Sequence, residues 1–131
     1  METQEIKIAE IIVTTGIYDL IKEHVRRKKV TNEQEQVLLN RLKFAKQLRR
    51  VEIPNDVVDI DTIVQVKNLA TNQINTYKFV APSKAKQKRQ TLSILGEIGI
   101  IFIGCKQGAV IQWPNGNEIQ EFEIIAIEPL Q

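Results

Sequence analysis

The sequence predicts an α+β fold: an antiparallel helical hairpin (a short coiled coil) within residues 1–50, followed by an antiparallel sheet within residues 51–131. Two observations support this prediction. Apolar residues recur at helical spacing before residue 50, and beyond Pro54 their period shortens from about 3.6 residues to about 2, as in strands. With 43% apolar and 26% charged residues, the 131-residue chain has the composition of a folded globular protein.

The first predicted helix follows an N-terminal extension and covers Thr15–Lys28, about 21 Å at 1.5 Å per residue. Thr14 or Thr15 supplies its N-terminal cap. Its apolar face is expected to carry Ile17, Leu20, Ile21 and Val25. Positive charge suits the C-terminal end of a helix dipole, and four consecutive cations stand there: Arg26, Arg27, Lys28 and Lys29.

The second predicted helix begins after Val30, with Thr31 as its cap and Gln34 placed for a capping box. We interpret Glu33 and Glu35 as acids that favour the positive start of this helix. Its apolar face is expected to carry Val37, Leu38, Leu42, Ala45 and Leu48, before Arg49 and Arg50 close it. Because the connection between the helices is so short, they should pack antiparallel.

Strands are expected in the second half, with polar or glycine-containing turns between them. The strand segments are 63–66, 74–80, 91–95, 110–113 and 118–128. Asn115 and Gly116 give the last pair a tight hairpin turn. The nearly all-apolar segment 96–104 fits a strand or a helix by composition alone.

Charge is unevenly distributed along the chain. The net charge is +2, but residues 1–50 carry 11 Lys/Arg against 7 Asp/Glu, whereas residues 51–131 carry 7 against 9. The two halves are therefore expected to meet different surfaces. Basic residues cluster at 26–29, 49–50 and 84–89. Each cluster is either a solvated surface or a contact with an acidic protein surface or nucleic acid. Direct nucleic-acid binding is the weaker hypothesis, because the net charge is small and no exposed aromatic stacking motif is visible.

Few residues are candidates for catalysis. Cys105 is the only cysteine and has no neighbouring His or acid, so an idle buried thiol is expected. His24 is the only histidine, no cluster has the spacing of metal ligands, and no glycine-rich phosphate loop is present. We expect no enzyme activity, cofactor or metal. The sequence shows neither a signal peptide nor a membrane span, so a cytoplasmic location without a membrane partner is expected. The oligomeric state is left open: a monomer is favoured, and the apolar run 98–103 would allow a dimer.

Several spaced motifs resemble the Gre transcript-cleavage factors of bacteria and the related Rnk regulators of nucleoside diphosphate kinase. The segment 93–104, Ser-Ile-Leu-Gly-Glu-Ile-Gly-Ile-Ile-Phe-Ile-Gly, is similar to their Ser-Pro-Leu-Gly signature region, and Gly108 follows it. Upstream, Ile53-Pro54-Asn55-Asp56-Val57-Val58 is similar to the junction of the Rnk branch. Val64–Leu69 and Tyr77–Pro82 resemble two further strands of the family. The resemblance covers nearly all of residues 51–131.

This resemblance implies an FKBP-like α+β fold for residues 51–131, with Glu97–Ile103 as a short helix on the sheet. It also implies RNA polymerase as the partner, with the globular domain at the rim of the secondary channel and the hairpin pointing into it. The expected hairpin-tip contacts are Arg26, Arg27, Lys28, Lys29, Glu33 and Glu35. Those of the globular domain are Lys84, Lys86, Lys88 and Arg89 in the loop 83–90, together with Ile98 and Gly99. Nucleic acid would be met only indirectly.

The chain departs from the family pattern at functionally relevant positions. Ala109 stands where relatives usually have Asp, and the loop 83–90, commonly acidic in relatives, is basic here. The tip lacks the acidic motif by which Gre factors promote RNA cleavage, so no cleavage stimulation is expected. Two alternatives remain: a binding module with a basic hairpin tip, and a prolyl isomerase of the FKBP type. The second would need an aromatic-lined pocket, for which the domain offers Tyr77, Phe79, Phe102, Trp113 and Phe122.

Overall fold

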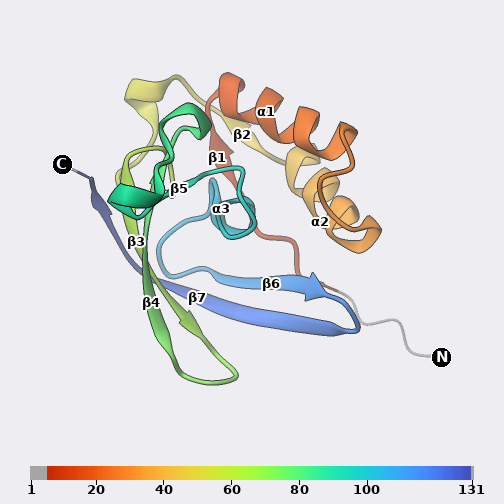
Figure 1. Ribbon diagram of the computed structural model, residues 1–131. Helices are drawn as coiled ribbons and strands as arrows, with labels where there is room; N and C mark the ends of the chain where they lie inside the picture. Colours follow the sequence, from red (N-terminus) through yellow and green to blue (C-terminus); the bar gives the residue numbers. More distant parts are fainter. Residues whose placement is uncertain (1–5, 131) are drawn as a thin grey trace.

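The computed structural model describes residues 6–130 and has the α+β class expected from the sequence (Figure 1). The strands are β1 (Ile12–Val13), β2 (Lys46–Gln47), β3 (Thr62–Asn68), β4 (Ile74–Val80), β5 (Thr91–Ser93), β6 (Val110–Asn115) and β7 (Glu118–Pro129). The helices are α1 (Thr15–Arg26), α2 (Asn32–Lys43) and α3 (Gly99–Phe102), with short 3-10 turns η1 (Arg50–Glu52), η2 (Pro82–Lys84) and η3 (Gln87–Arg89). No helix among the described residues is long and apolar enough to span a membrane.

Both N-terminal helices begin where the capping residues predicted. The Thr14 hydroxyl accepts a hydrogen bond from the backbone N–H of Ile17. At α2 the Thr31 hydroxyl accepts from the N–H of Gln34, whose side-chain oxygen accepts from the N–H of Thr31. This reciprocal pair is the predicted capping box, and it satisfies two amides that a helix start otherwise leaves without partners.

The second helix is shorter than predicted. We expected it to continue past Leu48, but α2 ends at Lys43. The following residues turn away from the helix, and β2 runs parallel to β1. The N–H groups of Lys46 and Leu48 donate to the carbonyls of Ile11 and Val13 at 3.0 Å. The prediction was wrong because tertiary pairing with the N-terminal segment overrides the helical periodicity of residues 45–48.

The five-stranded sheet has the order β5-β4-β3-β7-β6. β3 pairs antiparallel with β4 and β7, and β6 pairs antiparallel with β7. β5 runs parallel to β4, so the all-antiparallel sheet predicted from the sequence is wrong at this edge. The reason is the loop 81–90, which carries the chain back along the sheet edge, so that β5 enters in the same direction as β4. A parallel neighbour requires such a crossover connection.

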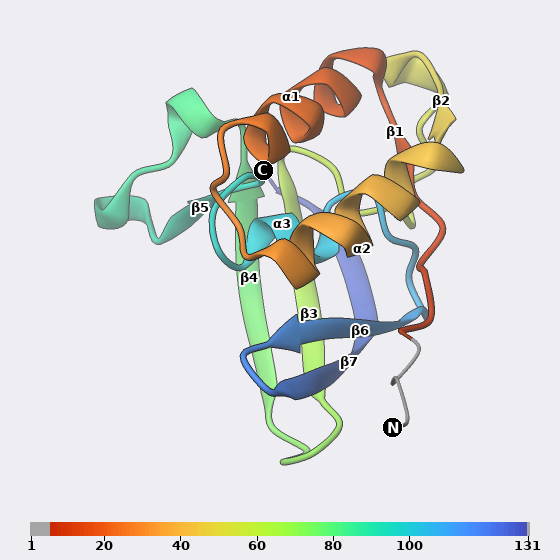
Figure 2. The same cartoon turned by 90° about the vertical axis from the view of Figure 1, so that its right-hand side faces the viewer.

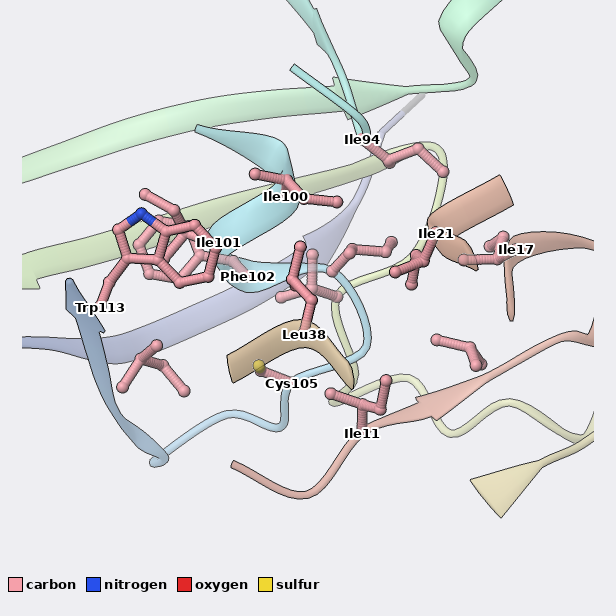
Figure 3. Close-up of a cluster of buried hydrophobic side chains, with 14 of the residues drawn as sticks. Ile11, Ile17, Ile21, Leu38, Ile94, Ile100, Ile101, Phe102, Cys105 and Trp113 are labelled. Atoms are coloured by element: carbon pink, nitrogen blue, oxygen red, sulfur yellow. The ribbon is translucent and has the colours of Figure 1, made fainter. Parts of the chain in front are cut away.

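One hydrophobic core lies between the helices and the sheet. Figure 2 shows α1, α2 and α3 in front of one face of the sheet. Buried side chains from α1, α2, α3 and the strands form a single cluster, and Figure 3 shows Ile21 and Leu38 directed toward Ile100 and Phe102. Ile11 and Val13 are also buried, so the last residues of the predicted N-terminal extension are part of this core. Cys105 is fully buried as expected, and burial raises the pKa of its thiol.

Arg41 is the exception in this core, because it is a charged side chain only 2% exposed. It lies on the buried face of α2 between Val37, Leu38 and Leu42. Its guanidinium donates to the carbonyl oxygen of Ile101 at 2.7 Å and lies 5.5 Å from the centre of the Trp113 ring. No carboxylate of the described residues pairs with it, and its Nε has no partner there. Arg41 thus ties α2 to α3 and β6 through one hydrogen bond and one cation–π contact.

Shortening this side chain should loosen the attachment of α2. We expect Arg41→Ala to lower the free energy of unfolding by about 2–4 kcal/mol, because packing, the hydrogen bond and the cation–π contact are lost together. Arg41→Met keeps most of the volume and removes an unpaired buried charge, so its loss should be under about 1.5 kcal/mol. Urea unfolding measures both values. A loss for Arg41→Met equal to that for Arg41→Ala would contradict this account.

Candidate partner-binding site

The segment between the first two helices, residues 26–31, is called here the interhelix turn and contains the four predicted cations. α1 ends at Arg26, and Lys28 adopts a left-handed backbone with φ of 56°. The N–H of Lys29 donates to the carbonyl of His24 at 3.3 Å. The turn is therefore compact, and the capping box at Thr31 fixes where α2 begins.

Much of the positive charge of the interhelix turn is offset by carboxylates. Glu23 accepts hydrogen bonds from Arg26 and Arg27 at 2.9 Å. These bonds, that from Arg26 foremost, lower the pKa of Glu23 from its ordinary 4.5 to about 2. Lys28 pairs with Glu35 at 2.9 Å. Since residues 23–35 contain four Lys/Arg and three Glu, their net charge is only +1.

Of the four cations in this turn, Lys29 alone has no ion-pair partner among residues 6–130. Glu33 and Glu35 lie in the first turn of α2, as we interpreted them. No group of three acidic, His or Cys residues in the described part of the chain is placed to hold a metal ion. The turn therefore presents exposed, partly paired cations and no cluster of carboxylates.

A groove of about 700 Å³ lies beside the interhelix turn. Its apolar floor is formed by Ile98, Ile100, Ile101 and Trp113, and its rim by Lys28, Lys29, Glu97, Asn115 and Gln120. His24 also lines it, and burial, followed by the charge of Lys29, lowers the pKa of that imidazole. The side-chain amide of Gln34 donates to the carbonyl of Pro114 at 2.9 Å, which holds the start of α2 against β6.

The glycine-containing segment 93–104 supplies Ile98, Ile100 and Ile101 of the groove floor. The short helix predicted at 97–103 is present as α3, over the narrower range Gly99–Phe102. A Cβ atom at Gly99 would lie 2.2 Å from the carbonyl oxygen of Ser93 and 2.7 Å from the Cα of Ile94. No side chain fits there. Gly99 is buried and is therefore a packing position, whereas Ile98 is half-buried at the groove.

The basic loop, defined as residues 84–89, is a separate surface. Lys84, Lys86, Lys88 and Arg89 are all exposed on the two 3-10 turns η2 and η3. None of them lines the groove. Of the predicted contact residues, the structure thus brings together Lys28, Lys29 and Ile98, and it leaves the basic loop elsewhere.

Sequence reasoning missed Trp113 and Arg41. Trp113 was considered only among the aromatic residues of the isomerase alternative, but it is part of the groove floor. Arg41 could have been found, because it falls at helical spacing from Val37, Leu38 and Leu42 on the apolar face. The aromatic residues considered for isomerase activity do not line an open pocket together: Phe79 and Phe102 are at most 1% exposed.

Comparison with known proteins identifies the family. Residues 53–129 match the family model "Transcription elongation factor, GreA/GreB, C-term". The chain is also 30% identical to a transcription elongation factor GreA of Clostridium novyi over 127 residues, which are 92% of this chain and 80% of that protein. This chain belongs to the GreA/GreB family.

The GreA/GreB relationship extends to shorter matches and to the fold. The regulator of nucleoside diphosphate kinase of Escherichia coli is 27% identical over 78 residues, 59% of this chain and 57% of that regulator. A solved transcription elongation factor GreA/GreB from Nitrosomonas europaea has the same fold, with a TM-score of 0.60 at 19% identity. The superposition covers 90% of this chain and 97% of that one. The family predicted from segment 93–104 and the upstream motifs is therefore confirmed.

The close approach at Gly99 gives a direct test of how the segment 93–104 is packed. Gly99→Ala should lower the free energy of unfolding by more than about 2 kcal/mol, because the new methyl group meets fixed backbone atoms. Gly16→Ala is the matched control: its Cβ would meet only the Thr14 hydroxyl at 3.9 Å, and within α1 it should stabilise by about 0.5–1 kcal/mol. Thermal unfolding of both variants measures the difference. Equal effects would show that Gly99 is not under steric constraint.

Proposed function

We propose that this GreA/GreB-family chain regulates transcription elongation by binding RNA polymerase at the rim of the secondary channel, without stimulating transcript cleavage. The observation that carries the proposal is the groove, where the interhelix turn meets the segment 93–104 and Trp113. It offers an apolar floor with a polar and basic rim, which is the composition of a specific protein interface. Lys29, without an ion-pair partner among the described residues, is available to an acidic partner surface.

Geometry and charge support the proposed absence of cleavage stimulation. Cleavage promotion in this family depends on carboxylates delivered into the active site of the polymerase. α1 has 12 residues, about 18 Å, and the start of α2 is held on β6 by Gln34. Glu35 is paired with Lys28 and its side chain is only 15% exposed. These helices are short and lie against the sheet (Figure 2). This arrangement is unsuited to bringing a carboxylate to a distant metal ion.

The finer features of the proposal rest on the sequence patterns and, for the FKBP-like fold, on the family resemblance. They are the antiparallel geometry of the helical hairpin, the FKBP-like character of residues 51–131, the domain boundary at residue 50 and a cytoplasmic location. The proposed polymerase contacts are Arg26, Arg27, Lys28, Lys29 and Ile98, with Glu33 and Glu35 as helix-start acids. The alternative of a strongly basic tip as a nucleic-acid module is disfavoured by the net charge of +1 over residues 23–35.

A competition assay tests this function. A backtracked complex of the cognate polymerase is mixed with a Gre factor, and this protein is added in increasing amounts. We expect Gre-stimulated RNA cleavage to fall, and no cleavage when this protein is added alone. Lys29→Glu should weaken the competition at least tenfold, because it reverses the charge at the groove rim. Lys22→Glu makes the same charge change at an exposed position outside the groove and should compete as well as the parent chain.

Two results would contradict the proposal. Cleavage stimulated by this protein alone would assign a catalytic role to Glu33 and Glu35. Failure to bind polymerase, measured by co-elution, would mean that the chain retains the family fold without this function.

A further inference from the structure

Residues 62–96 carry an unusual charge distribution. This 35-residue segment contains six Lys or Arg and no Asp or Glu. The cations are Lys67, Lys78, Lys84, Lys86, Lys88 and Arg89. The rest of the chain then has twelve Lys or Arg against all sixteen Asp or Glu, so it is acidic overall. The positive net charge of the protein therefore comes from this one segment.

The fold places this segment at one side of the sheet. It forms β3, β4, β5 and the basic loop, whereas the acidic Glu118, Glu121, Glu123 and Glu128 lie on β7. Lys67 is opposite Glu123 in the register and is offset by it. Lys78 lies between Ile63 and Thr91 on the neighbouring strands, with no acid beside it. Lys78 pairs with β5 and the basic loop leads into β5, so both lie at the β5 edge of the sheet and are together called the basic surface.

The basic loop has a fixed backbone. The Thr91 hydroxyl accepts from the N–H of Lys86 at 2.9 Å, and the N–H of Thr91 donates to the carbonyl of Lys86 at 3.2 Å. Lys84 and Arg89 donate backbone hydrogen bonds to Ala81 and Lys86, and Gln90 closes the turn with φ of 56°. Figures 1 and 2 show the loop standing out from the body of the protein beyond β5. Binding would therefore cost little conformational entropy for ordering the loop backbone.

The charges of this surface are not used within the protein. Lys84, Lys86, Lys88 and Arg89 are exposed, and none of them forms an ion pair within residues 6–130. Four exposed cations within six residues repel one another, since no ion pair among the described residues offsets their charge. A polyanion removes that repulsion and releases its own counterions, which is the main source of affinity for nucleic-acid phosphates.

We propose that the basic loop and Lys78 bind the phosphate backbone of duplex DNA. Nucleic-acid bases are not the target, because the aromatic residues of this segment are turned inward: Phe79 is fully buried and Tyr77 is packed against the core. Binding of a single strand usually relies on exposed aromatic side chains that stack on the bases, and this surface has none among the aromatic residues of the segment. It is better suited to a duplex, whose phosphates can be contacted without reading the bases. This contact is separate from the groove and requires no polymerase.

The test uses the full chain alone with a labelled duplex DNA of random sequence, followed by fluorescence anisotropy from 25 to about 200 mM salt. We expect micromolar binding at low salt that weakens steeply as salt rises. The loop variant carries Lys84→Gln, Lys86→Gln, Lys88→Gln and Arg89→Gln. Four lost phosphate contacts should reduce the slope of log affinity against log salt by about 3–4 and weaken binding more than tenfold at low salt.

A matched control separates the loop from net charge alone. It carries Lys7→Gln, Lys22→Gln, Lys43→Gln and Lys46→Gln, which remove the same charge at exposed positions outside the surface, and it should retain the parent slope. Equal losses in both variants would overturn the proposal, because the binding would then follow total charge. Tighter binding to a single-stranded RNA of equal length than to the duplex would also overturn it. The measurement contains no polymerase, so this proposal can fail while the proposed function stands.

Discussion

The burial of the helices against the sheet is the constraint on which the rest of the structure depends. Ile21 of α1 and Leu38 of α2 are almost fully buried together with Ile100 and Ile124. Neither helix is long enough to be stable in water by itself. Their stability must therefore come from this shared core, and Arg41 adds a polar tie from α2 to the carbonyl of Ile101. Because the interhelix turn joins these two helices, the packing of the core also determines the position of the turn.

This constraint shapes the candidate site. Because α2 is packed on β6, the cations of the interhelix turn lie at the rim of the groove rather than at the end of a projecting arm. The carboxylates of Glu23 and Glu35 offset part of the positive charge. What remains is an apolar floor with a weakly basic rim. Such a surface suits binding to a protein partner better than delivery of metal-binding groups to a remote active site.

Local sequence signals predicted those parts of the fold that depend on local interactions. The caps at Thr14 and Thr31, β4, and the hairpin at Gly116 follow from residues within a few positions of each other. The predictions were wrong where contacts between segments distant in the sequence determine the structure. The end of α2 depends on pairing between β1 and β2, and the parallel placement of β5 depends on the path of the loop 81–90. Neither the end of α2 nor the direction of β5 is indicated by a local sequence pattern.

The candidate site was predicted only in part, for the same reason. Lys28, Lys29 and Ile98 were identified from the charge run and from the family signature. Sequence spacing does not indicate that these residues share one groove with Trp113, since that depends on how the helices pack on the sheet. Gly99 was assigned to the interface, but its lack of a side chain serves the close approach of Ser93 and Ile94.

Native-state hydrogen exchange tests the central claim, that helices and sheet share one core, most directly. The amide protons of Ile21 and Leu38 should exchange with the same free energy of opening as those of Val64 and Ile124, because one cooperative unit opens as a whole. Opening of α1 and α2 at a clearly lower free energy, while β3 and β7 stay protected, would contradict the account. The helices would then form a separate unit, free to move away from the groove.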